Sequence, residues 1–227
     1  MGSEMCIRDS RRSFADSALR ARAAGFDGVE IHGANGYLLD AFHTDYLNVR
    51  QDQYGGSPKA RVRLATEVAR DIRAAVGEDF IVGIRISQGK ASHPDHTWSG
   101  GVQEARTIFG ALADSGLDYI HTTEHRASDP AFPDEDSRPL SELARTFAPG
   151  TTVIANGHID TGEEAQGLLS SGRADLVSIG RAALSNRDWP LRVRGGHALE
   201  PPFSTDRFGG GLATVQAWEV EADRLLS

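Results

Sequence analysis

The chain has 227 residues, 39% of them hydrophobic, which is ordinary globular material with enough apolar residues for one core. Its formal net charge of −8 argues against nucleic-acid and anionic-membrane partners, which require a basic surface. The single cysteine, Cys6, excludes an internal disulfide and a multi-cysteine metal site, and it fits a reducing cytoplasm. Because the sequence has no apolar run of about 18 residues, we expect no transmembrane helix.

Residues 1–12 lack the apolar stretch of a signal peptide, and we predict that they form a disordered leader. Residues 13–227 are expected to form one domain without linkers or repeats. Apolar runs with strand-type spacing predict strands at 28–32, 80–87, 117–123, 152–155 and 176–179. Helical spacing predicts helices at 13–24, 37–42, 58–76, around 105–112, at 140–147, from 161 to 172, at 182–185 and at 215–226. This alternation predicts a parallel α/β arrangement with five strands.

Local signals mark several of these boundaries. Ser57 and Pro58 have the spacing of an N-cap and a first helical residue, and Gly77 follows as a stop. Thr161 and Glu164 have the spacing of a capping box. Long loops are expected at 44–56, 88–101 and 126–138, and a turn at Trp189-Pro190.

The chemistry is concentrated just after the first predicted strand, where His32, Asn35 and Tyr37 follow one another. Loops after parallel strands are where α/β enzymes place reactive groups, since the sheet holds the loop while leaving it open. If this loop winds into a helical turn, His32 and Asn35 lie on one face and direct two N–H donors at one oxygen. Tyr37 adds a phenol as a proton donor. The alternative is a polar loop whose side chains cap a helix.

The run Gly-Val-Glu-Ile-His-Gly-Ala-Asn-Gly-Tyr-Leu-Leu at 28–39 closely resembles the Old Yellow Enzyme family of FMN-dependent ene-reductases (NADH:flavin oxidoreductases). Asn48, Arg50, Asp52 and the Tyr-Gly-Gly-Ser run at 54–57 continue the match. The resemblance extends over about residues 13–195 and covers only the C-terminal part of the family. It implies a (β/α)8 TIM barrel in which strands four to eight are present and the N-terminal strands are missing. The first ten residues do not resemble the family, and we expect a foreign or mispredicted leader.

The resemblance also implies the roles of the substrate-binding residues. His32 and Asn35 are expected to bind the carbonyl oxygen of an α,β-unsaturated substrate, and Tyr37 to protonate the carbon beside the carbonyl group. NAD(P)H is the implied reductant, FMN the implied cofactor, and a small enone-type molecule the implied partner.

For the cofactor, the resemblance implies that Arg85 lies beside the flavin pyrimidine ring and stabilises negative charge on the reduced flavin. It places the FMN phosphate at Gly157, His158, Gly180 and Arg181. An arginine in an apolar strand needs a negative partner, and an ion pair with Glu30 is the structural alternative for Arg85. For Gly180 and Arg181, the alternative is a helix start with a surface arginine.

Three other interpretations remain open from the sequence. A non-redox phosphate-binding barrel enzyme would use the same glycines, and a catalytically silent fragment would keep the motifs without turnover. A homo-oligomer in which a five-stranded open sheet closes by dimerisation is the alternative architecture. No metal site is expected, because the spacing of His121, Glu124 and His125 does not match a zinc motif.

A barrel that lacks three strands has unpaired strand edges and an unfilled interior. We therefore expect the isolated chain to be poorly stable, or to aggregate, unless a partner covers the gap. The missing strands would also supply flavin contacts, so we expect weakened retention of the flavin ring.

Overall fold

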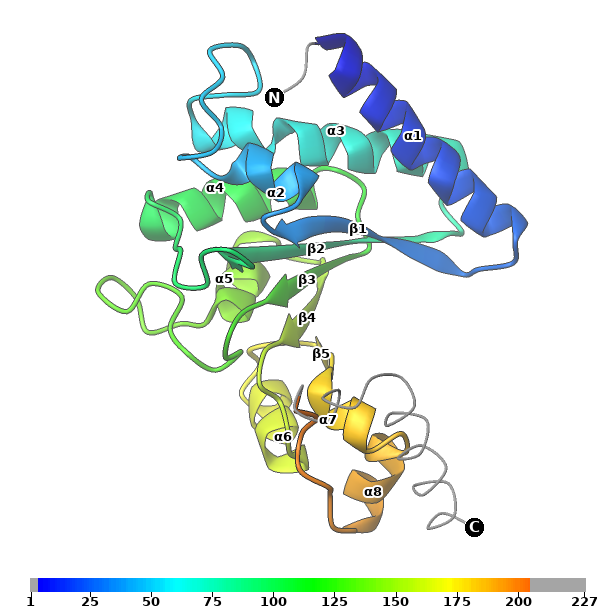
Figure 1. Cartoon of the computed structure of the whole chain (residues 1–227), viewed down its shortest axis with the longest axis vertical. Coiled ribbons are helices and arrows are strands. Elements are labelled where there is room, and N and C mark those ends of the chain that lie inside the picture. Colours follow the sequence, from blue (N-terminus) through cyan, green and yellow to red (C-terminus); the bar gives the residue numbers. More distant parts are fainter. Residues whose placement is uncertain (1–3, 205–227) are drawn as a thin grey trace. The chain divides into compact units, whose positions relative to one another are not determined.

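The computed structural model describes residues 4–204 and separates them into two compact units (Figure 1). The first unit runs to His158 and takes in Gln166–Ser178. The second takes in Ile159–Ala165 and the described residues from Ile179 onward.

The first unit is built on a five-stranded parallel sheet with the strand order β1-β2-β3-β4-β5. The strands are β1 (Gly28–Asn35), β2 (Ile81–Lys90), β3 (Tyr119–Thr123), β4 (Thr152–Asn156) and β5 (Leu176–Val177). Within the described part of the chain, β1 and β5 are the edges of the sheet. The predicted parallel α/β arrangement with five strands is confirmed.

Helices cover one face of this sheet (Figure 1). The helices of the first unit are α1 (Glu4–Ala23), α2 (Leu38–His43), α3 (Pro58–Val76), α4 (Gly101–Ala113) and α5 (Leu140–Phe147). α1 packs on α3, α3 on α4, and α4 on α5. Strand side chains that alternate toward these helices join their core, and they are Ile31, Val82, Ile84, Ile86, Ile120 and Val153. The alternate residues, which carry most of the polar side chains of the strands, therefore lie on the opposite face.

α3 begins and ends where the sequence predicts. The Ser57 hydroxyl accepts a hydrogen bond from the Ala60 N–H at 3.3 Å, and Pro58 occupies the first turn. Gly77 ends the helix with a φ of 78°, a left-handed conformation that favours glycine. Apolar residues at Leu64, Val68 and Ile72 lie buried between these caps.

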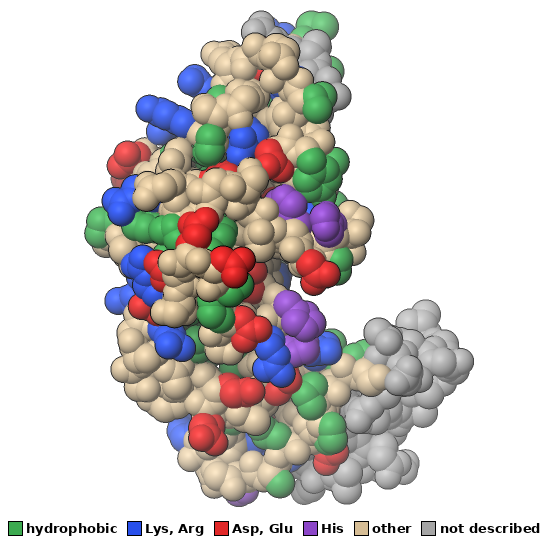
Figure 2. All heavy atoms as spheres, turned by 90° about the vertical axis from the view of Figure 1, so that its left-hand side faces the viewer, with side chains coloured by type: hydrophobic (Ala, Val, Ile, Leu, Met, Phe, Trp, Pro, Cys, Tyr) green, Lys and Arg blue, Asp and Glu red, His purple; other side chains and the backbone are tan. Residues whose placement is uncertain are grey.

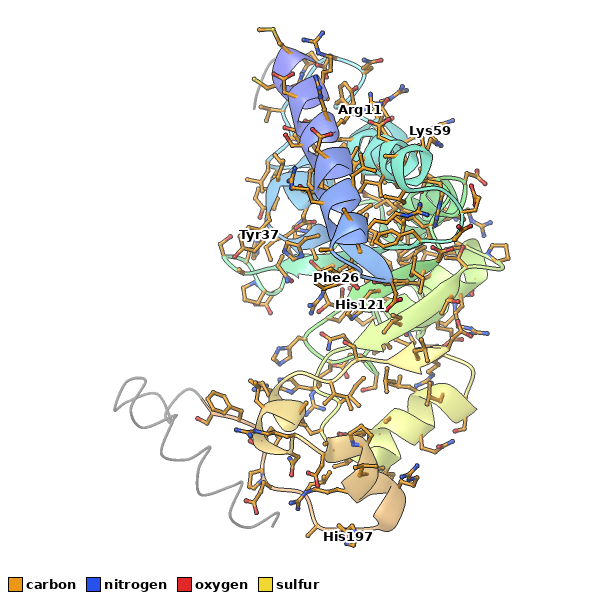
Figure 3. The ribbon with its side chains drawn as sticks, turned by 90° about the vertical axis from the view of Figure 1, so that its right-hand side faces the viewer. Arg11, Phe26, Tyr37, Lys59, His121 and His197 are labelled. Atoms are coloured by element: carbon orange, nitrogen blue, oxygen red, sulfur yellow. The ribbon has the colours of Figure 1, made fainter. Side chains whose placement is uncertain are left out.

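The N-terminal segment differs from the prediction. α1 begins at Glu4, so residues 4–12 are helical and the expected disorder of the leader is wrong for them. Ile7 is buried, and the Arg11 guanidinium donates to Asp71 at 2.7 Å and Glu67 at 3.0 Å on α3 (Figure 3). These contacts explain why residues 4–12 are helical, because they join the first turns of α1 to the rest of the unit.

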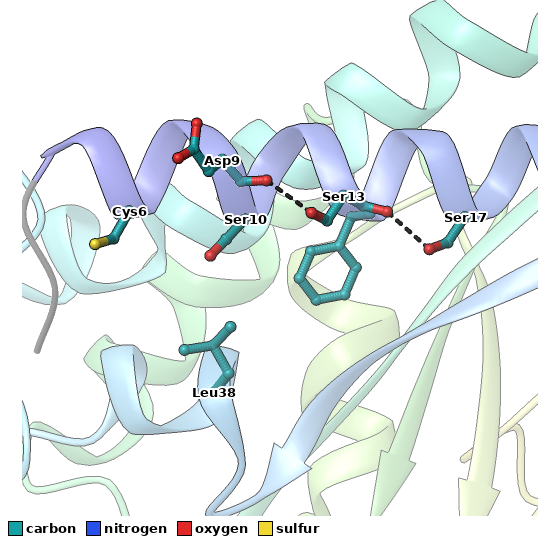
Figure 4. Close-up of a pocket in the computed structure, with 7 residues that line it drawn as sticks. Cys6, Asp9, Ser10, Ser13, Ser17 and Leu38 are labelled. Carbon is teal, nitrogen blue, oxygen red and sulfur yellow. Dashed lines mark hydrogen bonds between the residues drawn. The ribbon is translucent and has the colours of Figure 1, made fainter.

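A groove of about 540 Å³ lies between one side of α1 and Leu38 of α2 (Figure 4). Its lining consists of Cys6, Asp9, Ser10, Ser13, Phe14, Ser17 and Leu38. The Ser13 and Ser17 hydroxyls donate to backbone carbonyls one turn earlier, at 2.9 and 2.7 Å. The hydroxyls of Ser13 and Ser17 are thus satisfied within α1, and apart from Leu38 the groove is formed by this helix.

Other boundaries also differ from the prediction. β1 continues past His32 to Asn35, and β2 continues to Lys90, where a loop was expected from residue 88. β5 is reduced to Leu176–Val177. The expected helix at 215–226 lies outside the described residues.

The second unit contains α7 (Arg181–Ser185) and α8 (Trp189–Gly195), and α6 (Gly162–Ser170) begins in it. The expected turn at Trp189-Pro190 is instead the start of α8, because proline is tolerated in a first helical turn. The Trp189 indole N–H donates to the Asp160 carbonyl at 3.3 Å, which anchors α8 within this unit. The predicted capping box of α6 is present, with the Glu164 N–H donating to the Thr161 hydroxyl at 3.2 Å and the Thr161 N–H donating to the Glu164 carboxylate at 3.0 Å.

Among residues 4–204, no helix is both long and apolar enough to cross a lipid bilayer.

Candidate active site

The candidate site lies where the parallel strands end, on the sheet face opposite the helices. In the strand register, His32 on β1 is opposite Arg85 on β2, and Arg85 is opposite His121 on β3. Because paired residues of a parallel sheet point to the same side, these three side chains share one face. The sheet thus brings together, on three consecutive strands, residues that are 36 to 89 positions apart in the sequence.

His32 and Tyr37 lie next to each other at the end of β1. Their ring centroids are 5.2 Å apart with an interplanar angle of 50°, and Tyr37 is the N-cap residue of α2. The Tyr37 side chain is exposed at one end of the sheet (Figure 3). An imidazole and a phenol are therefore accessible side by side, as the predicted substrate-binding role requires.

Asn35 is the last residue of β1, in a conformation that the sequence did not predict. His32 and Asn35 belong to β1 and not to a helical turn, so the expected i, i+3 face is wrong. The register between β1 and β2 shifts between Gly33 and Asn35, and Asn35 has a left-handed φ of 61°. An irregularity of this kind re-aims a side chain at the end of a strand.

Arg85 has neutral hydrogen-bond partners on the sheet. Its Nη2 donates to the Thr123 hydroxyl at 2.9 Å and to the Asn156 side-chain oxygen at 3.1 Å. Its Nε is buried and has no hydrogen-bond partner among the described residues. The alternative ion pair with Glu30 is not what the structure shows, since the Glu30 carboxylate pairs with His121 at 2.8 Å. Among the described residues Arg85 therefore has no direct carboxylate hydrogen-bond partner, and its Nε is an unused donor for a bound group.

A polar relay that the sequence analysis missed crosses the same face. The His121 ring contacts Glu30 on β1 through Nδ1 and the Ser178 hydroxyl after β5 through Nε2, both at 2.8 Å. Burial would raise the pKa of Glu30, but the hydrogen bond and the charge of His121 lower it overall. In the predicted strand, Tyr119 and His121 alternate with Ile120 and Thr122, which was the available signal, but this pattern does not identify hydrogen-bond partners.

Glu124 is a second residue that the sequence analysis did not assign to the site. It follows β3 directly, and its carboxylate accepts a hydrogen bond from the Gln88 N–H at 3.0 Å. Burial raises the pKa of Glu124 to about 7, although this hydrogen bond and the charge of Lys90 act in the opposite direction. The site edge thus contains a carboxyl group that titrates near neutral pH.

Two of the predicted phosphate-binding residues, Gly157 and His158, follow β4 in the first unit. A Cβ atom at Gly157 would lie 2.3 Å from the Glu124 carbonyl oxygen, so glycine is required for this close approach of two loops. His158 has a left-handed φ of 42°, and its ring centroid is 4.5 Å from that of His125. His125 thus contacts His158, whereas His121 contacts Glu30 and Ser178.

The other two, Gly180 and Arg181, lie in the second unit. Gly180 is the N-cap residue of α7, and a Cβ atom there would meet nothing within 4 Å. The Arg181 residue is exposed, and its carbonyl accepts the Phe203 N–H at 3.0 Å. The backbone at this helix start is open to an approaching group.

The edge at which the strands end carries several histidines (Figure 2). Besides the His125–His158 pair, His93 and His96 form a cluster with Tyr46, with ring centroids 5.3 to 5.9 Å apart. The His96 Nδ1 contacts the Gln88 carbonyl at 2.9 Å, which fixes this cluster to the end of β2. Aromatic and imidazole rings therefore border the site on the side of the long loop after β2.

The sequence matches the model of the NADH:flavin oxidoreductase / NADH oxidase family over residues 3–200. The match begins within the segment that was expected to be a leader. A chanoclavine-I aldehyde reductase of Penicillium roqueforti is 40% identical over 196 residues, which are 83% of this chain and 51% of that protein. The 12-oxophytodienoate reductase 7 of Oryza sativa is 37% identical over 194 residues, or 80% of this chain and 48% of that protein.

The fold is similar to that of morphinone reductase in complex with tetrahydroNAD, with a TM-score of 0.75 and 31% sequence identity. That match covers 90% of this chain and 53% of the morphinone reductase chain. The chain thus spans about half the length of these relatives. The five parallel strands correspond to part of a parallel β/α barrel, which confirms the predicted partial barrel.

Proposed function

Because the chain belongs to the NADH:flavin oxidoreductase / NADH oxidase family, we propose that it forms the substrate-binding part of an FMN-dependent enzyme that reduces the C=C bond of α,β-unsaturated carbonyl compounds with NAD(P)H. The observation that carries this proposal is the contact between the His32 and Tyr37 rings on the face where Arg85 neighbours His32. Relatives named as aldehyde and 12-oxophytodienoate reductases support this class of substrate.

In the proposed reaction, His32 and Asn35 hold the carbonyl oxygen of the substrate. The imidazole and amide N–H groups donate to this oxygen as negative charge develops on it. Each such donor contributes about 3 kcal/mol, so the loss of one lowers the rate by roughly 10² to 10³. The Tyr37 phenol, which is exposed beside His32, donates the proton that completes the saturated carbon next to the carbonyl group.

Arg85 is the residue that we assign to the flavin ring. FMN, when bound, supplies the redox step by taking hydride from NAD(P)H and passing it to the substrate. The residues present fit the cofactor, because Arg85 holds an unpartnered, buried Nε and pairs with no carboxylate through a direct hydrogen bond among the described residues. Its charge would stabilise an anionic ring beside it.

The assignment of Gly157 and His158, and of Gly180 and Arg181, to the FMN phosphate stays a prediction from the family resemblance. The open backbone at Gly180 and the exposed Arg181 are suited to a phosphate, since arginine binds phosphate oxygens through a fork of donors. The comparisons do not favour the alternative of a non-redox phosphate-binding barrel enzyme.

The test is a titration of FMN with the full chain, in which the quenching of flavin fluorescence measures binding. We expect saturable binding, and we expect Arg85→Met to weaken it about tenfold by removing one charge-assisted contact. Lys59→Met is the matched control, because Lys59 is an exposed cation on α3. Equal binding by the two variants would refute the role of Arg85, and absence of saturable binding would refute the cofactor assignment for this chain. Oxidation of NADPH that depends on 2-cyclohexen-1-one then tests the reaction.

A further inference from the structure

The backbone between His32 and Tyr37 is held in an unusual conformation. Asn35 and Gly36 have φ values of 61° and 88°, both in the left-handed region. Glycine adopts this region freely, whereas an asparagine there needs surrounding contacts that hold it. The orientation of the Asn35 and Tyr37 side chains depends on these two residues, because they determine the direction of the chain after β1.

Hydrogen bonds from β2 and α2 hold this backbone. The Asn35 N–H donates to the Ser87 hydroxyl at 2.9 Å, and the Asn35 carbonyl accepts the Ala91 N–H at 3.1 Å. The Gly36 N–H donates to the Asp40 Oδ2 at 2.6 Å. The carboxylate of Asp40 is thus the acceptor for the left-handed glycine.

Asp40 is in turn fixed by Lys90. The Lys90 Nζ donates to the Asp40 Oδ1 at 2.8 Å, and both side chains are completely buried. Lys90 is also the strand partner of Asn35 in the register of β1 and β2. One buried lysine therefore contacts the loop twice, through its backbone position and through the carboxylate that binds Gly36.

A buried ion pair is a poor source of stability, because removing two charges from water costs about as much as their attraction returns. Burial raises the pKa of Asp40 even though Lys90 and the Gly36 N–H act to lower it. The carboxylate is therefore unfavourably placed in energetic terms. Such pairs are best attested where they select one conformation among several.

We propose that Lys90 is a positioning residue of this site, which acts through Asp40 to hold Gly36, and with it Asn35 and Tyr37, in the orientation that addresses the substrate. The role in substrate binding rests on the proposed function; the control of the loop conformation does not. The chain has only two lysines, so the exposed Lys59 provides a matched control for the buried Lys90.

The first experiment compares Lys90→Met with Lys59→Met in the full chain by amide hydrogen exchange and by the NMR contact between the His32 and Tyr37 rings. We expect Lys90→Met to lower the protection of the Gly36 N–H at least about tenfold relative to the β2 amides of Val82 and Ile84, and to abolish the ring contact. Lys59→Met should change neither. A general stability role would lower all amides together, and that result, or an unchanged Gly36 amide, would overturn the proposal.

Lys90→Met leaves the Asp40 carboxylate without its cation, which can prevent folding. The double variant Lys90→Met/Asp40→Asn removes both charges and keeps an oxygen for the Gly36 N–H. We expect the same selective loss of protection, since an amide at position 40 is no longer anchored. Wild-type protection of Gly36 in this variant would overturn the proposal as well.

The second experiment titrates the same proteins with 2-cyclohexen-1-one. We expect Lys90→Met to weaken binding about tenfold and Lys59→Met to leave it unchanged. If the wild-type chain does not bind this enone, the proposed substrate fails while the Gly36 exchange data still decide whether Lys90 positions the loop. If Lys90→Met binds the enone as wild type does, the positioning role fails and the proposed function stands.

Discussion

Tyr37 is 62% exposed and its ring lies against the His32 ring, so its phenol is open to a substrate. We expect Tyr37→Phe to keep the ring contact and remove the proton donor. In a full-length relative with the same motif, the corresponding change should slow enone reduction by about 10² to 10⁴ and leave reduction of the flavin by NAD(P)H unchanged. Stopped-flow measurement of the two half-reactions checks this, and equal losses in both would contradict the assignment.

Glu124 predicts a pH dependence of stability. Its pKa is raised from 4.5 to about 7, so between these pH values the folded chain keeps a proton that the unfolded chain releases. The free energy of unfolding therefore contains a contribution that is fully present below pH 4.5 and falls by up to about 1.4 kcal/mol per pH unit until pH 7. We expect Glu124→Gln, which keeps an acceptor for the Gln88 N–H, to remove this contribution.

Urea unfolding of both proteins from pH 4.5 to 8 provides the measurement. The difference between variant and wild type is the relevant quantity, because the buried His43 contributes in the opposite direction. Burial lowers the pKa of His43 to about 3, aided by the charges of Lys90 and Arg61, so its stabilising contribution is lost as the pH falls below 6.5. A pH-independent difference between Glu124→Gln and wild type would contradict the prediction.

At the scale of single residues, the family resemblance pointed to His32, Asn35, Tyr37 and Arg85, whereas residue type and spacing alone left a polar loop and a structural ion pair as alternatives. It did not identify their partners. The acceptors of Arg85 lie on β3 and β4, and the Glu30–His121–Ser178 relay joins β1 and β3 to the residue that follows β5. Contacts of this kind depend on strand register, which no local pattern of residue types specifies.

Among the elements, α3 and α4 are joined by a buried ion pair between Arg61 and Glu104. The Arg61 Nε also donates to the His43 carbonyl at 2.8 Å, so the same guanidinium secures the end of α2. We expect Arg61→Met to lower the free energy of unfolding by about 3 to 5 kcal/mol, because it leaves the Glu104 carboxylate buried without its cation.

Urea unfolding again provides the measurement, with Arg12→Met as the control. Arg12 forms an exposed pair with Asp16 at 3.8 Å, and pairs of this kind contribute less than about 1 kcal/mol. Similar effects of the two substitutions would show that Arg61 does not hold α2, α3 and α4 together.

Element boundaries were predictable where local caps exist, as at Ser57 and Gly77 of α3. They were missed where tertiary contacts extend or shorten an element. β1 and β2 run beyond their apolar residues because Asn35 pairs with Lys90, and α1 starts early because Arg11 binds α3.

For the whole molecule, the decisive feature is the uncovered sheet of the first unit. β1 and β5 are the edge strands of the described sheet, and apolar side chains remain exposed on it, with Ile81 at 49% and Leu176 at 53%. Unpaired parallel strands with such side chains favour association between chains. The alternative is that two chains form a dimer in which the exposed sheet edges are closed.

We therefore expect the 227-residue chain to self-associate and to unfold at low temperature unless a partner covers the sheet. Light scattering coupled to size-exclusion chromatography and a thermal melt, each with and without FMN, measure this. Co-expression with the N-terminal half of a relative should raise the melting temperature. A cooperative melt of a monomer at high temperature without flavin would contradict the prediction, and a stable dimer would favour the closed alternative.

The sequence by itself determined the parallel α/β class, because periodicity and caps act over short stretches of chain. Its resemblance to a known family, carried by the run at 28–39, supplied the partial barrel and the roles expected around His32. The tertiary structure decided how that run is held. The Lys90–Asp40 pair joins residues 50 positions apart and the His121–Glu30 contact joins residues 91 positions apart. Such contacts exist only after strands and helices have packed, so the left-handed backbone at Asn35 and the charge environment of the site followed from the fold and not from any local pattern.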